Sequence, residues 1–389
     1  MSEKIFAYVS SWTHGSGPVG LCLYSLDRDS GALTLIRQLD DKTNFGVSAA
    51  DPKRGVFYAL DESANADGVH GSGGGGRLFA YKIDPENGGL EEISRVSTYC
   101  SNPSYVTLDA SGKYLVVSHH TTRSSITKLI RDAYGQFHPY VEHDDPYVEL
   151  FSVHEDGSVG TLLDAVKHEG CGPDPQQQSH AHPHCAVMSP SGELFTVCDK
   201  GNDHIYMYTI DRERDRLVPA SLAYACEPGS KPRFCAYHPT RPYLYQNNEG
   251  RAYVGAYRYQ EDGRMELIGN YGVVLEENKD LPGHRVQQDL RIDGRGEFLY
   301  TVVRDPAMVA VYQISQDTGS LKLIQNMLLP SGTDWPRGCA LSPDGRFLVV
   351  TAMRSGQIMT LAVGEDGTLS DTGLSVEQPG AAFITFYQP

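Results

Sequence analysis

Residues 342–348 read Ser-Pro-Asp-Gly-Arg-Phe-Leu, a tight turn followed by an apolar pair, and this frame recurs along the chain. Its six copies begin at Asp51, Asp109, Ser189, His238, Asp293 and Ser342. Subtracting successive starts gives spacings of 58, 80, 49, 55 and 49 residues. A short apolar strand precedes each frame and a second follows it, and a third and a more polar fourth come after further turns. Four short strands per unit, joined by turns rich in glycine, aspartate and proline, are typical of a β-propeller blade.

The second strands number seven along the chain. The first of them, residues 4–9, has no strand before it, and the apolar residues 381–386 have no second strand after them. We therefore expect the C-terminal strand to complete the N-terminal blade, which closes the ring and hides two open edges. The sequence thus predicts an all-β protein, a seven-bladed β-propeller with four-stranded antiparallel blades in a single domain over residues 1–389. Six or eight blades would require a miscounted repeat.

Two stretches interrupt the repeat. An insertion at residues 120–147 lengthens the third blade and contains weak helical patterns near residues 120–135. It is a candidate lid or interface, or a solvated loop. The glycine-rich run Gly71–Gly76 lacks the following Gly-Lys-Ser/Thr and helix of a phosphate-binding loop, so we expect a flexible hairpin in the second blade.

Composition narrows the class of function. The chain of 389 residues has 49 acidic and 33 basic residues and a formal net charge of −16, which argues against nucleic acid or an anionic membrane as partner. The N-terminal residues lack the pattern of an export signal, and no apolar stretch approaches about 18 residues, so a cytoplasmic protein is expected. Its eight cysteines include no Cys-x-x-Cys pair and are expected to be free and reduced. The sequence does not indicate an oligomeric state.

The blade topology gathers polar residues that are distant in sequence. Starts of first strands and ends of second strands share the face of the channel mouth, whereas the frame turns lie on the opposite face. A single histidine at such a strand end commonly caps a turn, and a single charged residue is commonly solvated. Polar residues at these positions in several blades, however, favour one shared pocket. The residues at these positions are His182, His184, Arg233, Asn248, Glu249 and Arg304, with His119, His120 and Lys200 as further second-strand ends.

Other catalytic patterns are weak. No Gly-x-Ser-x-Gly elbow occurs, which leaves a serine hydrolase without support. His180, His182 and His184 alternate and would share one side of an extended segment, as metal ligands do. No carboxylate partners are evident near them, so we expect neither a metal nor a cofactor.

The run His168-Glu-Gly-Cys-Gly-Pro-Asp-Pro-Gln-Gln-Gln178, followed by His182-Pro-His184, resembles a motif of the seven-bladed β-propeller lactonases. That family includes bacterial propeller-type 6-phosphogluconolactonase and fungal carboxymuconate cyclase. Further similar segments are Gly229–Arg233, Asn248-Glu249, the strand Gln288–Arg291, and Arg304. The resemblance implies His184, Arg233, Glu249 and Arg304 as the catalytic cluster.

Two positions depart from the family motif. Gln177 stands where the family has arginine, which removes one contact to a phosphate or carboxylate, and Cys185 stands where the family has serine.

The resemblance implies hydrolysis of a small-molecule sugar lactone, 6-phospho-glucono-1,5-lactone to 6-phosphogluconate in the pentose phosphate pathway. Glu249 or His184 would serve as general base, and two arginines, Arg233 and Arg304, would hold the anionic substrate and polarise the carbonyl. We expect further substrate contacts from four residues, His182, Asn248, Gln178 and Lys200. The alternatives are a cyclase that forms a lactone from an unsaturated dicarboxylate, and a non-catalytic propeller that binds a ligand or protein.

Overall fold

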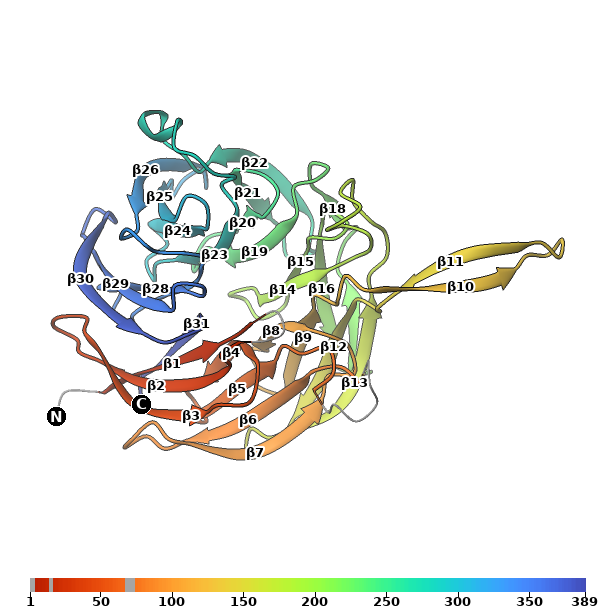
Figure 1. The fold of residues 1–389 in the computed structure, drawn as a ribbon, viewed down its shortest axis with the longest axis horizontal. Coiled ribbons are helices and arrows are strands. Elements are labelled where there is room, and N and C mark those ends of the chain that lie inside the picture. Colours follow the sequence, from red (N-terminus) through yellow and green to blue (C-terminus); the bar gives the residue numbers. More distant parts are fainter. Residues whose placement is uncertain (1–3, 14–16, 67–73) are drawn as a thin grey trace.

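The computed structural model describes residues 4–13, 17–66 and 74–389, and in them seven antiparallel sheets form a ring (Figure 1). Each sheet is one blade, with its first strand nearest the channel. The seven-bladed β-propeller predicted from the repeat is therefore confirmed. No described helix is long and apolar enough to cross a membrane.

From the channel outward, the first four blades contain the following strands. Blade 1 has β31 (Ala381–Tyr387), β1 (Ile5–Ser11), β2 (Gly20–Leu26) and β3 (Leu33–Asp40). Blade 2 has β4 (Phe45–Asp51), β5 (Val56–Asp61), β6 (Arg77–Ile83) and β7 (Leu90–Ser97). Blade 3 has β8 (Pro103–Leu108), β9 (Tyr114–His119), β12 (Tyr147–Val153) and β13 (Val159–Lys167). Blade 4 has β14 (Pro183–Met188), β15 (Phe195–Asp199), β16 (His204–Asp211) and β17 (Arg216–Pro219), with β18 (Tyr224–Ala225) also pairing β16.

The remaining three blades follow the same order. Blade 5 has β19 (Pro232–Tyr237), β20 (Tyr243–Asn248), β21 (Tyr253–Tyr259) and β22 (Met265–Gly272). Blade 6 has β23 (Gln287–Ile292), β24 (Phe298–Val303), β25 (Met308–Ile314) and β26 (Leu321–Leu328). Blade 7 has β27 (Pro336–Leu341), β28 (Phe347–Ala352), β29 (Gln357–Val363) and β30 (Leu369–Glu377). A single 3-10 turn, η1 (Glu276–Asn278), is the helical element of the described residues.

The ring closes as the sequence predicts. The last strand, β31, pairs antiparallel with β1 from Phe6↔Tyr387 to Ser11↔Ala381, so the two ends of the chain form one sheet. Second strands such as β5 and β28 are buried along their whole length, whereas the outermost strand β3 is mostly exposed. Apolar side chains on both faces of a second strand pack against the blades on either side, and this packing forms the core.

The inner strand of every blade carries a register irregularity close to its start. The residue that directly follows the first paired position of the strand lies in this irregularity, alone in blades 1, 3, 4 and 7 and with one further residue in blades 2, 5 and 6. Bulges commonly re-aim side chains beside functional sites. From blade 1 to blade 7 these bulge residues are Ala382, Gly46, Ser104, His184, Arg233, Gln288 and Arg337.

The insertion in blade 3 is not helical, so the helical patterns near residues 120–135 were misleading. It forms the hairpin β10 (Ser125–Arg131) and β11 (Phe137–His143), which projects far from the ring (Figure 1). Three of the seven residues of β10 are β-branched, namely Ile126, Thr127 and Ile130, and such residues favour a strand over a helix. Only Gly74–Gly76 of the glycine-rich run are described; they lie between β5 and β6, and the rest of that predicted hairpin lies outside the described residues.

Candidate active site

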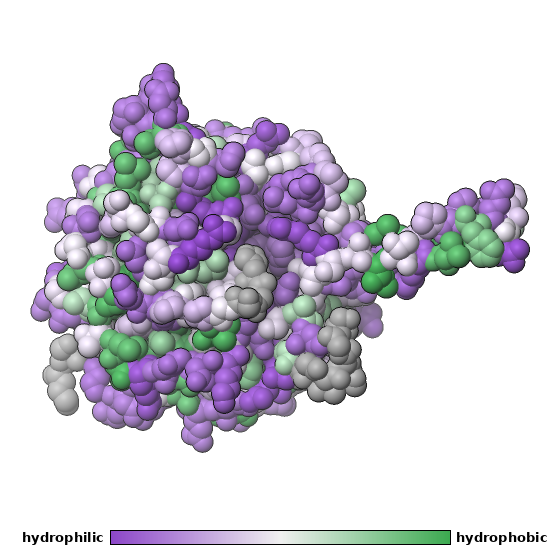
Figure 2. All heavy atoms as spheres, viewed as in Figure 1, coloured by the Kyte–Doolittle hydropathy of each residue, from purple (hydrophilic) through white to green (hydrophobic). Residues whose placement is uncertain are grey.

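A cavity of about 960 Å³ opens at the mouth of the channel. In the space-filling view, hydrophilic residues gather around the hollow at the centre of this face (Figure 2). Two positions per blade supply most of its charged lining: the bulge residue of the inner strand and the residue that directly follows the second strand. Members of the first group that line it are His184, Arg233, Gln288 and Arg337, and members of the second are Trp12, Glu62, His120, Lys200, Glu249 and Arg304.

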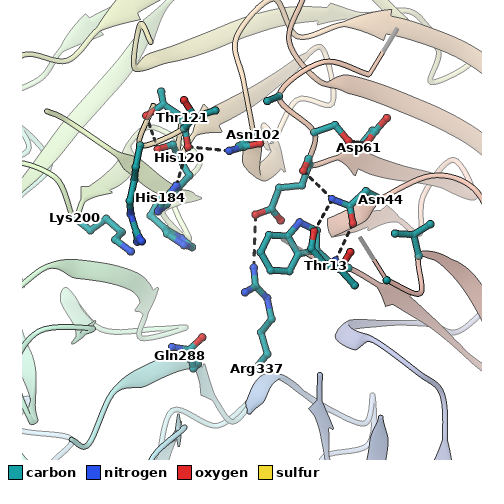
Figure 3. A pocket seen from close by; sticks show the side chains of 18 of the residues that line it. Thr13, Asn44, Asp61, Asn102, His120, Thr121, His184, Lys200, Gln288 and Arg337 are labelled. Atoms are coloured by element: carbon teal, nitrogen blue, oxygen red, sulfur yellow. Dashed lines mark hydrogen bonds and ion pairs between the residues drawn. The ribbon is translucent and has the colours of Figure 1, made fainter. Parts of the chain in front are cut away.

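Five of the eight predicted site residues line this cavity: His184, Lys200, Arg233, Glu249 and Arg304. They come from blades 4, 5 and 6, as the topology predicted. Figure 3 shows His184, Lys200, Gln288 and Arg337 directed into the same space from blades 4, 6 and 7.

The other three predicted residues are buried behind the cavity wall and do not line it. Gln178 donates from Nε2 to the carbonyl of Lys200 at 2.9 Å and to Asp203 Oδ1 at 2.8 Å. Asn248 donates to the carbonyl of Tyr253 at 3.0 Å, because successive residues of a strand point to opposite sides and its neighbour Glu249 takes the cavity side. His182 Nδ1 lies 2.7 Å from the carbonyl of His120. The expectation that these three contact substrate does not fit their positions.

An ionic cluster occupies the wall formed by blades 4 and 5. Lys200 Nζ donates to Glu249 Oε2 at 2.7 Å, and Arg233 Nε lies 3.3 Å from the same oxygen. Burial alone would raise the pKa of Glu249, but Lys200 and Arg233 together lower it well below its usual range. Burial lowers the pKa of Lys200 to about 8. Glu249 is therefore ionised at neutral pH, as the sequence predicted for a carboxylate beside Arg233.

A second carboxylate, Glu62, faces the cluster across the cavity and was missed by the sequence analysis. Its Oε1 lies 3.6 Å from Arg337 Nη2, beyond hydrogen-bonding distance, and its Oε2 has no hydrogen-bond partner in the described part of the chain. Burial raises the pKa of Glu62 to about 7, although Arg337 and Arg233 act in the opposite direction. Gly46 leaves room for this carboxylate, since a methyl group at Gly46 would clash with Oε2.

The same topological rule that found Glu249 also identifies Glu62, which directly follows β5, and Arg337, which begins β27. The sequence analysis named residues at these positions in blades 3 to 6 but none in blades 2 and 7. The bulge of blade 2 carries Gly46, whereas blades 4 and 5 carry His184 and Arg233 at this position. This glycine was a further indication that a neighbouring side chain, here Glu62, occupies the space.

Two other groups shape the cavity. His184 Nδ1 has no hydrogen-bond partner among the described residues, and its ring packs edge-on against His120 and Phe234. Burial, followed by the neighbouring Arg233, lowers the pKa of His184 well below its usual value, so the ring is neutral at pH 7. The Arg304 guanidinium stacks 3.9 Å from the centre of the Trp335 ring, which Arg354 also contacts at 3.7 Å.

The charges of the cavity are unevenly distributed. Four cationic side chains, Lys200, Arg233, Arg304 and Arg337, line the side formed by blades 4 to 7. The side formed by blades 1 to 3 balances two cations, Lys42 and Arg123, with two carboxylates, Asp61 and Glu62. It also presents neutral polar groups such as Asn44, whose Nδ2 donates to the carbonyls of Thr13 and Glu62. Guanidinium and ammonium groups in this arrangement suit an anionic ligand whose other end carries hydroxyl groups.

The family described as "Lactonase, 7-bladed beta-propeller" matches residues 6–386 of the chain. A 6-phosphogluconolactonase of Formosa agariphila is 26% identical over 356 residues, which are 90% of each chain. The 6-phosphogluconolactonase of Bacillus subtilis is 24% identical and covers 92% of this chain and 90% of its own. The solved structure of the periplasmic gluconolactonase PpgL of Pseudomonas aeruginosa superposes with a TM-score of 0.83 at 22% identity, covering 98% of this chain and 99% of its own.

Proposed function

Because this chain belongs to the lactonase family of seven-bladed β-propellers, we propose that it hydrolyses 6-phospho-glucono-1,5-lactone. The observation that carries the proposal is the cationic side of the cavity. A protein with a net charge of −16 places four cationic groups from four successive blades in one cavity, which favours an anionic substrate. Relatives named 6-phosphogluconolactonase support the same substrate class.

Hydrolysis adds water to the lactone carbonyl and breaks the bond between that carbon and the ring oxygen. A base takes a proton from the attacking water, and the ring oxygen leaves as a hydroxyl when it receives a proton. Arg233 and Lys200 stabilise the negative charge that develops on the carbonyl oxygen. The phosphate is held by Arg304, whose planar guanidinium is fixed by stacking on Trp335.

We assign the role of general base to Glu62 rather than to Glu249 or His184. A general base works best when its pKa lies near the operating pH, and burial raises the pKa of Glu62 to about 7. Glu249 is a weak base because Lys200 and Arg233 stabilise its ionised form. The depressed pKa of His184 likewise makes it a weak base. Glu249 instead holds Lys200 and Arg233 in place as an electrostatic member of the catalytic cluster.

The test compares hydrolysis of 6-phosphoglucono-1,5-lactone and glucono-1,5-lactone by the purified protein, measured as acid release above the spontaneous rate. We expect a higher kcat/KM for the phosphorylated lactone. Arg304→Ala should raise KM for the phosphorylated lactone by about tenfold, because it removes roughly one charge-assisted hydrogen bond. KM for the plain lactone should not change. Arg354→Ala, on the exposed side of the same Trp335 ring, is the matched control and should change neither.

Three results would contradict the proposal. Equal kcat/KM for the two lactones would show that the protein does not recognise the phosphate group. Failure to accelerate hydrolysis of any lactone would favour a non-catalytic propeller. Conversion of an unsaturated dicarboxylate into its lactone, with no hydrolysis of sugar lactones, would favour the cyclase alternative.

A further inference from the structure

A second cluster of reactive side chains lies in blade 3, behind the wall of the cavity. It contains Cys100, in the segment that joins β7 to β8, His119, the last residue of β9, and Glu149 in β12. One ligand atom of each residue lies within 4.8 Å of those of the other two. None of these three residues lines the cavity, so the proposed lactone hydrolysis does not use them.

The hydrogen bonds around His119 fix which ring nitrogen is available. Its Nδ1 lies 3.0 Å from the carbonyl oxygen of Tyr147, so Nδ1 carries the hydrogen and Nε2 presents a lone pair. Nε2 lies 3.6 Å from Glu149 Oε2. His119 is fully buried and Glu149 is 1% exposed, and neither atom has a hydrogen-bond partner in the described part of the chain. An ionised Glu149 would face this lone pair with no proton between the two atoms, which is costly in a buried position. Either a proton retained on Glu149 or a cation between the two atoms removes that cost.

We propose that Cys100, His119 and Glu149 bind a zinc ion at the junction of blades 2 and 3. Thiolate, imidazole and carboxylate are the ligands that zinc takes in proteins. A tetrahedral zinc ion with bonds of about 2.0 Å to nitrogen and oxygen holds those two atoms about 3.3 Å apart, close to the spacing observed here. The bond from Nδ1 to a backbone carbonyl is the usual outer support of a metal-bound histidine.

Charge and access are consistent with this ion. On binding, the Cys100 thiol releases its proton, so one thiolate and one carboxylate balance the two positive charges of zinc. The resulting neutral complex suits a buried position. Cys100 is only partly buried, which gives the ion an entry path and lets water take the fourth coordination position. Because the backbone of Cys100 also accepts a hydrogen bond from Gly76, just before β6, the metal would tie blade 2 to blade 3.

Another group of thiols, Cys185, Cys198 and Cys235, is a weaker candidate. The sulfur atoms of Cys185 and Cys235 are 3.9 Å apart, and all three residues are buried. Three thiolates around a divalent zinc ion would leave a net negative charge in an apolar core, with no histidine or carboxylate to share the site. This cluster therefore serves as the internal comparison for the test.

The test is a cobalt(II) titration of the full chain after dialysis against a chelator, followed by thiolate-to-cobalt charge-transfer absorption. We expect saturation at one ion per chain, displacement by zinc, and a higher Tm with zinc than without. Cys100→Ser should abolish the absorption and the rise in Tm while lactone hydrolysis continues. Glu149→Gln should weaken cobalt binding by more than about tenfold. Cys171→Ser, which changes an exposed cysteine outside both clusters, is the matched control and should retain the wild-type absorption.

The wild-type titration by itself decides whether the site exists, independently of how the variants fold. Absence of the charge-transfer absorption from the wild-type protein would overturn the proposal, as would its persistence in Cys100→Ser. Loss of the absorption in Cys235→Ser, with Cys100→Ser unaffected, would place the metal in the thiol cluster instead.

Discussion

Glu249 and Glu62 occupy equivalent positions in blades 5 and 2, each directly after the second strand of its blade, and both line the same cavity. Two cations, Lys200 and Arg233, contact one oxygen of Glu249, at 2.7 and 3.3 Å. The nearest cation to Glu62 is Arg337, at 3.6 Å, and its guanidinium also stacks on the Trp12 ring. Attraction therefore outweighs burial at Glu249, whereas burial outweighs attraction at Glu62.

The difference shows how a symmetric scaffold obtains two roles from one residue type. Raising the pKa of Glu62 from 4.5 to about 7 corresponds to roughly 3 kcal/mol against its ionised form. A carboxylate in that state exchanges a proton readily near neutral pH, while Glu249 remains a fixed negative charge. Pairs of acidic groups whose pKa values are driven apart commonly divide acid–base and electrostatic work in this way.

The largest expected effect is the fall in kcat when the general base is removed, and it tests the comparison between Glu62 and Glu249 directly. Glu62→Gln keeps the shape of the side chain and removes its proton-accepting oxygen, so kcat should fall by about 10²–10⁴-fold with little change in KM. Glu249→Gln should lower kcat by less, because it weakens the positioning of Lys200 and Arg233 without removing the base. Steady-state kinetics on 6-phosphoglucono-1,5-lactone measures both. A larger loss of kcat in Glu249→Gln than in Glu62→Gln would reverse the two assignments.

The repeat explains why so much of this arrangement was predictable. A frame that recurs six times specifies the blades, and the topology then places every first-strand start and second-strand end on one face. That reasoning alone gathered Arg233, Glu249 and Arg304, and it applies equally to Glu62 and Arg337. The ring closure by residues 381–386 followed from an unpaired strand at each end of the chain.

The parts of the site that were not predicted depend on features that a pattern of apolar residues does not encode. A one-residue bulge decides that His184 reaches the cavity while His182, two positions earlier, supports its wall. The pKa of Glu62 depends on distances between blades 2 and 7, which are far apart in sequence. The zinc ligands that we propose come from two strands of blade 3 and the segment that joins blade 2 to it, without the short spacing by which metal sites are usually recognised.

Stability should respond to the two glutamates with opposite signs. Glu249→Gln leaves Lys200 and Arg233 in a buried wall without their anion, which should lower the free energy of unfolding by up to about 3 kcal/mol. Glu62 binds a proton more tightly in the folded state, so its contribution to stability declines as pH rises from about 4.5 to about 7. Above that range Glu62→Gln should be more stable than wild type, and below about pH 4.5 the two should converge. Calorimetric Tm values at pH 5 and pH 8 test this, and a lower Tm for both variants at pH 8 would contradict it.

The smallest effect concerns the pH dependence of kcat/KM, which reports the ionisations of the free enzyme. The rate should rise about tenfold per pH unit up to about pH 7, as Glu62 loses its proton and becomes a base. It should fall above about pH 8, where Lys200 becomes neutral and no longer stabilises negative charge. The residual activity of Glu62→Gln should lack the acidic limb, and Lys200→Arg should lack the alkaline limb, because a guanidinium stays protonated. Initial rates across this range, corrected for spontaneous hydrolysis, measure both limbs. An acidic limb near pH 4 in the wild-type enzyme would assign the base to a carboxylate with an ordinary pKa and would remove the distinction between the two glutamates.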